Sequence, residues 1–246
     1  MVKVQDLERD EAARASYGAA ATEHFTWQTR GAYVAEQERE LCAAAFLPLG
    51  SKILDLGCGE GATLFHLGEP EGAVGVDLFE EKVALARKAL PRCRFVAASA
   101  LDLPFEAASF DHVLVRDVIH HIPEPQRLID EVARVLAPGG RVDVLEPCRY
   151  NPLIAAHGLA LPVERGELRS TEPFLRGLLR EHFRVEQVSR LQALPLHRIL
   201  LHPTMGKPSL GANLAFSAAL AEVEHLAARL MPKGMWAYMH LRALKR

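Results

Sequence analysis

The sequence contains few cysteines, and they are not arranged to bind a structural metal. Its four cysteines, Cys42, Cys58, Cys93 and Cys148, lie far apart and form no CxxC pair or zinc-finger spacing. A disulfide framework is therefore not expected, and the usage is typical of a reduced, cytoplasmic protein. No grouping of carboxylates and amides indicates an oxygen-ligated ion, so the sequence predicts no metal site.

Long apolar runs and an excess of basic residues are missing as well. No uninterrupted apolar segment is long enough to span a bilayer, and the first residues, MVKVQDLERDEAARASYG, include no apolar core of the signal-peptide type. Lysine and arginine number 29 against 31 acidic residues, which argues against a nucleic-acid partner. We expect a cytoplasmic protein that acts on a small molecule, as a monomer or a homodimer.

The sequence does contain a regular alternation of short apolar runs with helix-like segments. Helices are expected over residues 80–90 and 124–137. Five runs are typical of strands: KILDLG (52–57), GAVGVDL (72–78), CRFVAAS (93–99), DHVLVRD (111–117) and RVDVLEP (141–147). This rhythm predicts an α/β fold, with a parallel sheet covered by helices on both faces.

A glycine-rich loop follows the first predicted strand, in the sequence ILDLGCGEGA (53–62). A strand that leads into glycines and then a helix brings backbone N–H groups close to a ligand. The spacing is G-x-G-x-G, shorter than the G-x-G-x-x-G of dinucleotide sites, and Asp55 precedes it. An acid there suits a cationic amine, and Asp77, at the end of the second strand, is placed to accept hydrogen bonds from a ribose.

Four motifs together resemble class I S-adenosylmethionine-dependent methyltransferases, in particular the broad group that acts on small molecules. In order they are ILDLGCGEG, VGVDLF, ALDLPFEAASFDHVLVRDVIHHI and EVARVLAPGGRVDVLEP, between Lys52 and Pro147. The resemblance implies a Rossmann-like, seven-stranded sheet with an antiparallel last strand, and S-adenosylmethionine as cofactor. It also implies a set of cofactor-binding residues: Asp55, Gly57, Cys58, Gly59, Gly61, Asp77, Leu78, Ser99, Ala100, Leu101 and Arg116. Ser99 stands where the family often has an acid that accepts from the adenine amine.

The flanks of this core predict additional helices. Residues 6–47 are rich in alanine, glutamate and arginine, and residues 191–234 in leucine, alanine, histidine and methionine. APGG (137–140) is expected to stop a helix and STEP (170–173) to start one. We expect one domain over 1–246: an N-terminal helical segment (1–50), the cofactor-binding core (51–190), a helical cap insertion (191–234) and a final strand (235–246).

The acceptor site is expected where the fourth and fifth strands end, in RDVIHHIP and EPCRYNP. There His120 or His121, paired with Glu146, is the candidate general base. Because the two histidines are adjacent in the sequence, we expect their side chains to face different ways, so that one of them has a structural role. Arg116 and Asp117 are also candidates for a structural ion pair. Further substrate or lid candidates are Asp117, Arg149 and three aromatic residues that precede the core, which equally suit core packing: Tyr17, Trp27 and Tyr33.

The sequence thus predicts methyl transfer from S-adenosylmethionine to a small, oxygen-bearing and fairly apolar metabolite. One alternative is a protein of the same fold that binds the cofactor without transferring methyl, as a cyclase-like or binding scaffold. A NAD-dependent oxidoreductase is a weaker alternative, because it needs the longer glycine spacing.

Overall fold

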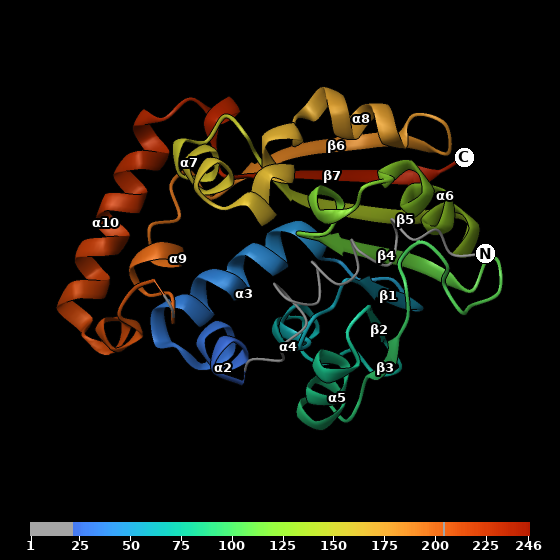
Figure 1. Cartoon of the computed structure of the whole chain (residues 1–246), viewed down its shortest axis with the longest axis horizontal. Coiled ribbons are helices and arrows are strands. Elements are labelled where there is room, and N and C mark those ends of the chain that lie inside the picture. The colour runs from blue at the N-terminus through green and yellow to red at the C-terminus, as the bar shows by residue number, and fades with distance from the viewer. Residues whose placement is uncertain (1–21, 204) are drawn as a thin grey trace.

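A computed structural model describes residues 22–203 and 205–246 of the chain. Its centre is a seven-stranded sheet in the order β3-β2-β1-β4-β5-β7-β6 (Figure 1). Neighbouring strands are parallel from β3 to β5, whereas β7 runs antiparallel to both β5 and β6. The strands are β1 Ile53–Leu56, β2 Val74–Asp77, β3 Arg94–Ala97, β4 Phe110–Arg116, β5 Leu136–Pro147, β6 Phe183–Leu191 and β7 Tyr238–Lys245. The α/β class, the seven strands and the antiparallel last strand predicted from the sequence are confirmed.

Helices cover both faces of the sheet, because consecutive strand residues point to opposite sides. The α-helices are α2 Thr22–Arg30, α3 Ala32–Phe46, α4 Ala62–His66, α5 Glu80–Ala89, α6 Pro125–Val135, α7 Pro152–Ala160, α8 Glu172–Leu179, α9 His197–Leu200 and α10 Leu214–Leu230. The 3₁₀ helices are η1 Ile119–His121, η2 Pro162–Arg169, η3 Pro208–Ala212 and η4 Lys233–Met235. One buried apolar cluster joins α6 and α8 to the sheet, and another joins α3, α4 and α5 to its opposite face.

The helices after β6 pack against the N-terminal helices, at the left of Figure 1. A third apolar cluster holds Trp27 of α2, Tyr33 and Val34 of α3, and Leu201 and Leu220 from the segment between β6 and β7. The helical insertion before the last strand is therefore confirmed. None of the helices in the part of the chain that the structure describes is long and apolar enough to cross a bilayer.

Two local expectations fared differently. STEP starts α8 as predicted, since Thr171 Oγ1 accepts from the Phe174 N–H at 3.3 Å. APGG lies beyond the end of its helix: α6 ends at Val135, and residues 136–140 already belong to β5, whose pairing with β4 is irregular there. Gly139 has a φ of +71°, which a residue with a side chain rarely adopts. The glycine therefore shapes an irregular strand rather than capping the helix.

Candidate functional site

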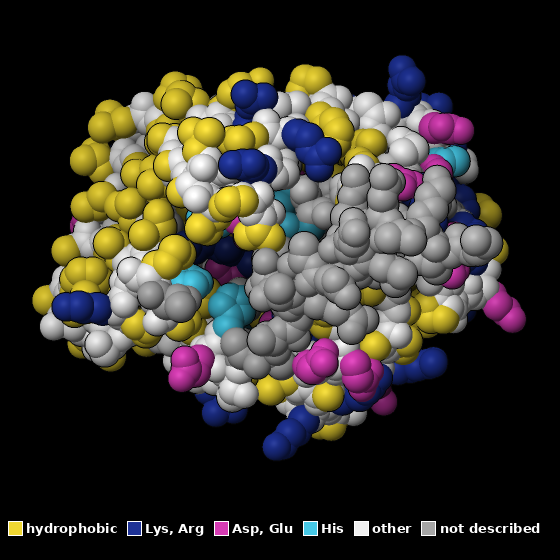
Figure 2. Space-filling model, in the orientation of Figure 1, with side chains coloured by type: hydrophobic (Ala, Val, Ile, Leu, Met, Phe, Trp, Pro, Cys, Tyr) yellow, Lys and Arg dark blue, Asp and Glu magenta, His cyan; other side chains and the backbone are white. Residues whose placement is uncertain are grey.

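A cavity of about 700 Å³ lies at the carboxyl edge of the parallel strands. Its walls come from the glycine loop after β1, from η1 after β4, from α7 and η2 after β5, and from α2 and α9. Figure 2 shows a hollow on this face in which histidine and charged side chains gather. Such a crevice is where open α/β sheets bind ligands.

The glycine loop owes its glycines to two different causes. Gly57 has a φ of +76°, and a Cβ on it would lie 2.2 Å from Val118 Cγ2, so packing alone requires glycine there. Gly59 also has a positive φ, of +51°, but no atom lies within 4 Å of where its Cβ would be. Open space beside a glycine that lines the cavity leaves room for a ligand against the backbone.

Asp55 is buried behind this loop with one oxygen unsatisfied. Its side chain is 1% exposed, and Oδ2 has no hydrogen-bond partner among the described residues. Burial raises the pKa of Asp55 to about 7, opposed by nearby Arg116 and reinforced by Asp77. A buried carboxylate in this state attracts a cationic ligand.

Asp77 ends β2 and holds the loop from the other side. Its Oδ2 accepts from the Gly59 N–H at 2.9 Å, and its Oδ1 accepts from the Phe79 N–H at 3.1 Å. Each oxygen keeps a further lone pair for a ligand hydroxyl. The residues expected to flank an adenine follow β2 and β3 and do not line the cavity itself: Leu78, Ser99, Ala100 and Leu101. Ser99 Oγ accepts from the Leu101 N–H at 3.2 Å, and Gly61 packs near Leu90, so their predicted cofactor contacts stay predictions.

Arg116 is held in a buried ion pair that the sequence did not indicate. Its Nη2 donates to Glu38 Oε2 of α3, and the other Glu38 oxygen accepts from Arg198 Nη2 at 2.6 Å. Burial would raise the pKa of Glu38, but Arg198 and Arg116 lower it to about 2. The alternative of an Arg116 pair with Asp117 is met more loosely, at 3.4 Å from Nε to Oδ2. Both arginines and Asp117 line the cavity, as Cys58 also does.

His120 and Glu146 form a hydrogen bond, but Glu146 does not reach the cavity. Its Oε2 contacts His120 Nδ1 at 2.7 Å, while Oε1 accepts from the N–H groups of Val118 and Ile119 at 2.8 and 2.7 Å. Glu146 is fully buried, so it holds η1 in place and orients the imidazole. Burial would lower the pKa of His120, but the Glu146 carboxylate raises it to about 9, which favours an imidazolium at neutral pH.

The expectation that the two histidines face different ways is wrong. Their ring centroids are 3.9 Å apart, and both Nε2 atoms approach Glu164 Oε2, at 3.8 Å for His120 and 4.0 Å for His121. The reason is the tight 3₁₀ turn of η1, from which both side chains reach the same cavity. Burial and the neighbouring His120 lower the pKa of His121 to about 3.

Several polar residues of the cavity were not anticipated from the sequence, and three of them belong to α7 and η2. They are His157 of α7, whose Nδ1 lies 3.1 Å from Glu167 Oε2, and Glu164 and Glu167 of η2. The two glutamates are three residues apart, which places both on one side of a helix with three residues per turn. That spacing was a usable signal only if a helix had been expected over these residues.

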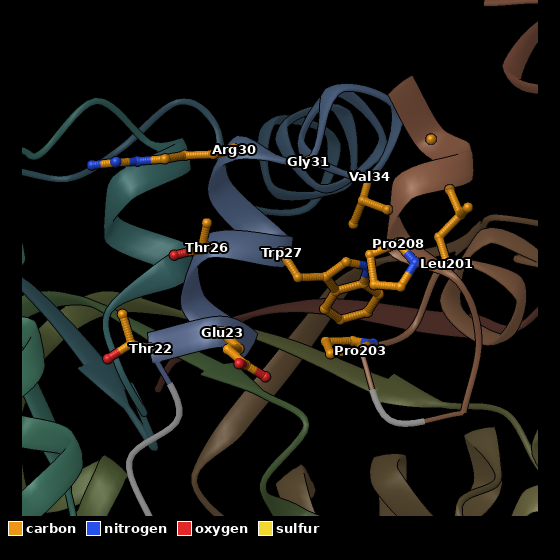
Figure 3. Close-up of a pocket in the computed structure, with 11 residues that line it drawn as sticks. Thr22, Glu23, Thr26, Trp27, Arg30, Gly31, Val34, Leu201, Pro203 and Pro208 are labelled. Atoms are coloured by element: carbon orange, nitrogen blue, oxygen red, sulfur yellow. The ribbon is translucent and has the colours of Figure 1, made fainter. Parts of the chain in front are cut away.

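The predicted lid and substrate residues lie in different places. Trp27 lines the main cavity and also a smaller one of about 430 Å³ between α2, α3 and the segment after β6 (Figure 3). Tyr33 packs away from the main cavity, and its hydroxyl donates to Glu224 Oε2 at 2.9 Å. Arg149 is exposed beside the Tyr150 ring and is not among the residues that line the main cavity, so its role at the acceptor site stays a prediction. Tyr17 lies outside the described residues.

Comparisons with known proteins agree with this fold. Residues 54–143 match a family described as methyltransferase domain. Among curated relatives, 27-O-demethylrifamycin SV methyltransferase of Amycolatopsis mediterranei (strain S699) is 33% identical over 48% of this chain and 48% of its own length. Demethylmenaquinone methyltransferase of Clavibacter sepedonicus is 39% identical over 39% of this chain and 41% of its own. The chain thus spans about half, or somewhat less, of the curated relatives that it matches.

Two solved structures extend the likeness to nearly the whole chain. Geranyl diphosphate C-methyltransferase from Streptomyces coelicolor A3(2) has a TM-score of 0.61 at 17% identity, covering 95% of this chain and 88% of that one. The [4+2]-cyclase SpnF has a TM-score of 0.55 at 22% identity, covering 98% and 93%. At these identities the likeness concerns the fold. Residues 54–143 thus match the methyltransferase domain family, and the seven-stranded sheet that contains them has the fold of solved methyltransferases.

Proposed function

We propose that this chain transfers a methyl group from S-adenosylmethionine to a small, oxygen-bearing and fairly apolar acceptor. The observation that carries the proposal is the unsatisfied Asp55 Oδ2 behind the glycine loop. A cationic partner stabilises the ionised form of a buried carboxylate that has no donor, and the ammonium group of this cofactor is such a cation. The donor and acceptor set of the loop therefore fits the cofactor.

The residues around the loop divide the work of holding the cofactor. Asp55 receives the ammonium group, directly or through a water, and Gly59 leaves space for the amino-acid part against the backbone. Asp77 uses its remaining lone pairs for the ribose hydroxyls. Leu78 and the segment 99–101 flank the adenine, with Ser99 in place of the stronger acidic acceptor. When bound, the cofactor supplies an electrophilic methyl group on a sulfonium.

The acceptor binds at the other end of the cavity. Glu146 orients the His120 ring through Nδ1, which directs Nε2 toward the cavity and an acceptor oxygen. Apolar side chains complete this end and exclude water from the reacting atoms: Leu153, Ile154, Leu161, Ile199 and Met205. The lipophilic character of this end of the cavity also agrees with relatives named for demethylmenaquinone and tocopherol.

The flanking helices serve this site as a cap. The segment 191–234 contributes Arg198, Ile199 and His202 to the cavity, and α2 contributes Trp27. Arg198 connects the insertion to α3 through Glu38. We infer that N-terminal segment, core, insertion and last strand work as one domain.

The test is titration calorimetry with S-adenosylmethionine and S-adenosylhomocysteine, followed by a screen of lipophilic phenols, quinols and alcohols for release of S-adenosylhomocysteine. We expect binding of both cofactor forms and release with at least one acceptor. No binding of either form at millimolar concentration would overturn the proposal.

A non-methylating scaffold is the second candidate, favoured by the fold shared with a cyclase over nearly the whole chain. It is distinguished by cofactor binding without S-adenosylhomocysteine release for any acceptor. A NAD-dependent oxidoreductase has little support, because antiparallel β7 occupies the place of a second parallel half.

A further inference from the structure

A cluster of imidazole and carboxylate groups lines the acceptor end of the cavity. His120 and His121 of η1 and Glu164 of η2 bring one ligand atom each to within 4.8 Å of one another. The two measured gaps from imidazole Nε2 to Glu164 Oε2 are 3.8 and 4.0 Å. Two histidines and one carboxylate on one side of a centre are the ligand set that divalent transition metals use when coordination positions stay open.

The spacing needs only a small adjustment to hold an ion. Metal–nitrogen and metal–oxygen bonds of about 2.0–2.2 Å place neighbouring ligand atoms roughly 3.4 Å apart in a tetrahedral site. The observed gaps exceed this by about half an ångström, a movement within reach of a glutamate side chain. Glu164 belongs to a 3₁₀ helix at the cavity wall.

The hydrogen bond between His120 and Glu146 independently orients the His120 ring for binding a ligand. His120 Nδ1 is fixed at 2.7 Å from the fully buried Glu146, so Nε2 is the nitrogen directed at the cavity. Metal-binding histidines commonly donate their second N–H to such a carboxylate, which fixes the ring and raises its basicity as a ligand. Glu146 is itself held by the N–H groups of Val118 and Ile119, so this support is rigid.

The geometry points to a binding site for one divalent transition-metal ion at His120, His121 and Glu164, of the class that includes Zn²⁺, Mn²⁺ and Fe²⁺. The open positions face the cavity, where an acceptor oxygen completes the coordination. A hydroxyl bound there loses its proton to solvent more readily, because the cation stabilises the oxygen anion. This departs from the sequence expectation of no metal. Its acceptor part rests on the proposed function, whereas the metal site does not.

The test uses the full chain without an affinity tag, stripped by a chelator and titrated with Zn²⁺ in calorimetry and with Co²⁺ in visible absorption. We expect one ion per chain, and a loss of affinity of at least about tenfold in His121→Ala and in Glu164→Gln. His24→Ala is the matched control, since His24 lines the same cavity outside the cluster and should leave metal affinity unchanged.

S-adenosylmethionine binding by each variant separates this inference from the proposed function. Both cluster variants should bind the cofactor as the wild type does, which also shows that they are folded. Uptake of no ion below about 100 μM, or equal affinity in the wild type and both cluster variants, overturns the metal site, whatever the cofactor result.

Discussion

Asp55 and Asp143 are buried carboxylates in one row of the sheet, with Leu114 between them in the strand register. Asp143 accepts from His112 and His240 at 2.9 and 2.8 Å, and is paired with two arginines. Burial would raise the pKa of Asp143, but these donors hold it well below the usual range. Asp55, only two strands away, has an orphaned oxygen and a pKa raised to about 7.

On the proposed function, this difference distinguishes a structural carboxylate, Asp143, from a cofactor-binding one, Asp55. Asp143 pairs with Arg141 and Arg242. Both arginines also donate to main-chain carbonyls at and after the end of α3, including those of Leu47, at 3.1 Å, and Pro48. That network therefore fastens the helix to the sheet. Asp55 Oδ2, by contrast, makes no hydrogen bond among the described residues. Burial destabilises the charged form of this carboxylate, and a bound cation would stabilise it. Equal burial on one face of a sheet thus serves opposite purposes.

The largest expected effect is on the structural side. Asp143→Asn removes the charge that compensates two arginines, and breaking such a buried pair should lower the free energy of unfolding by about 3–5 kcal/mol. Urea denaturation at pH 7 measures it. In the wild type this stabilisation is present above about pH 4 and is lost as the pH falls through the lowered pKa of Asp143. A loss under about 1 kcal/mol would contradict the structural role.

Asp55→Asn should act on binding instead of stability. Losing a charge-assisted contact worth about 1.5–3 kcal/mol should weaken S-adenosylmethionine binding about 10- to 150-fold. The unliganded variant should unfold no more easily than the wild type, because the unfavourable buried charge is gone. Calorimetry and urea denaturation on the same preparation give both values. A large loss of stability with unchanged affinity would place Asp55 in the same class as Asp143.

Asp77→Ala tests a carboxylate intermediate between the two. Asp77 already accepts from two backbone N–H groups and keeps lone pairs for a ribose. We expect cofactor affinity to fall about tenfold in the variant. The 2′,3′-dideoxy analogue of 5′-deoxyadenosine, which lacks both ribose hydroxyls, should bind the variant and the wild type equally. A fall of equal size with that truncated ligand would mean that the loop itself had collapsed.

The smallest effect is a pH dependence in the wild type. Because the pKa of Asp55 is raised to about 7, its ionised fraction grows between pH 6 and 7, and cofactor affinity should rise about fivefold over that interval. In the unliganded chain the sign is reversed: the stabilising contribution of Asp55 is full below about pH 4 and is lost as the pH rises through 7. Asp55→Asn should flatten the binding profile, and a profile that persists in this variant would assign it to another group.

Local patterns were enough to predict most of the fold. Strands β1 to β5 lie in the apolar runs because both faces of a parallel sheet are buried. Strand β6 was not located from the sequence, because it is an edge strand whose residues are mostly half-exposed and it therefore contains no apolar run. The glycine loop and Asp77 were visible because their chemistry depends on spacing along the chain.

The partners at the site were less visible, because they come from distant segments. Glu38 meets Arg116 and Arg198 across 78 and 160 residues, and no local pattern encodes such a meeting. Glu146 was correctly paired with a histidine. The sequence could not show that its other oxygen accepts hydrogen bonds from the N–H groups of Val118 and Ile119. The orientation of His121 was wrong because the 3₁₀ turn was not anticipated.

The shared carboxylate of Glu38 has a consequence for exchanging parts between proteins of this fold. Arg198 is the cation through which the insertion reaches Glu38, while Arg116 belongs to the sheet. A foreign insertion grafted between β6 and β7 without a basic residue at that point would leave Glu38 with one partner instead of two. Whether a transplanted insertion is compatible with this core therefore depends on one basic residue that pairs with Glu38. Chimeras that keep an arginine at that position should lose the least stability.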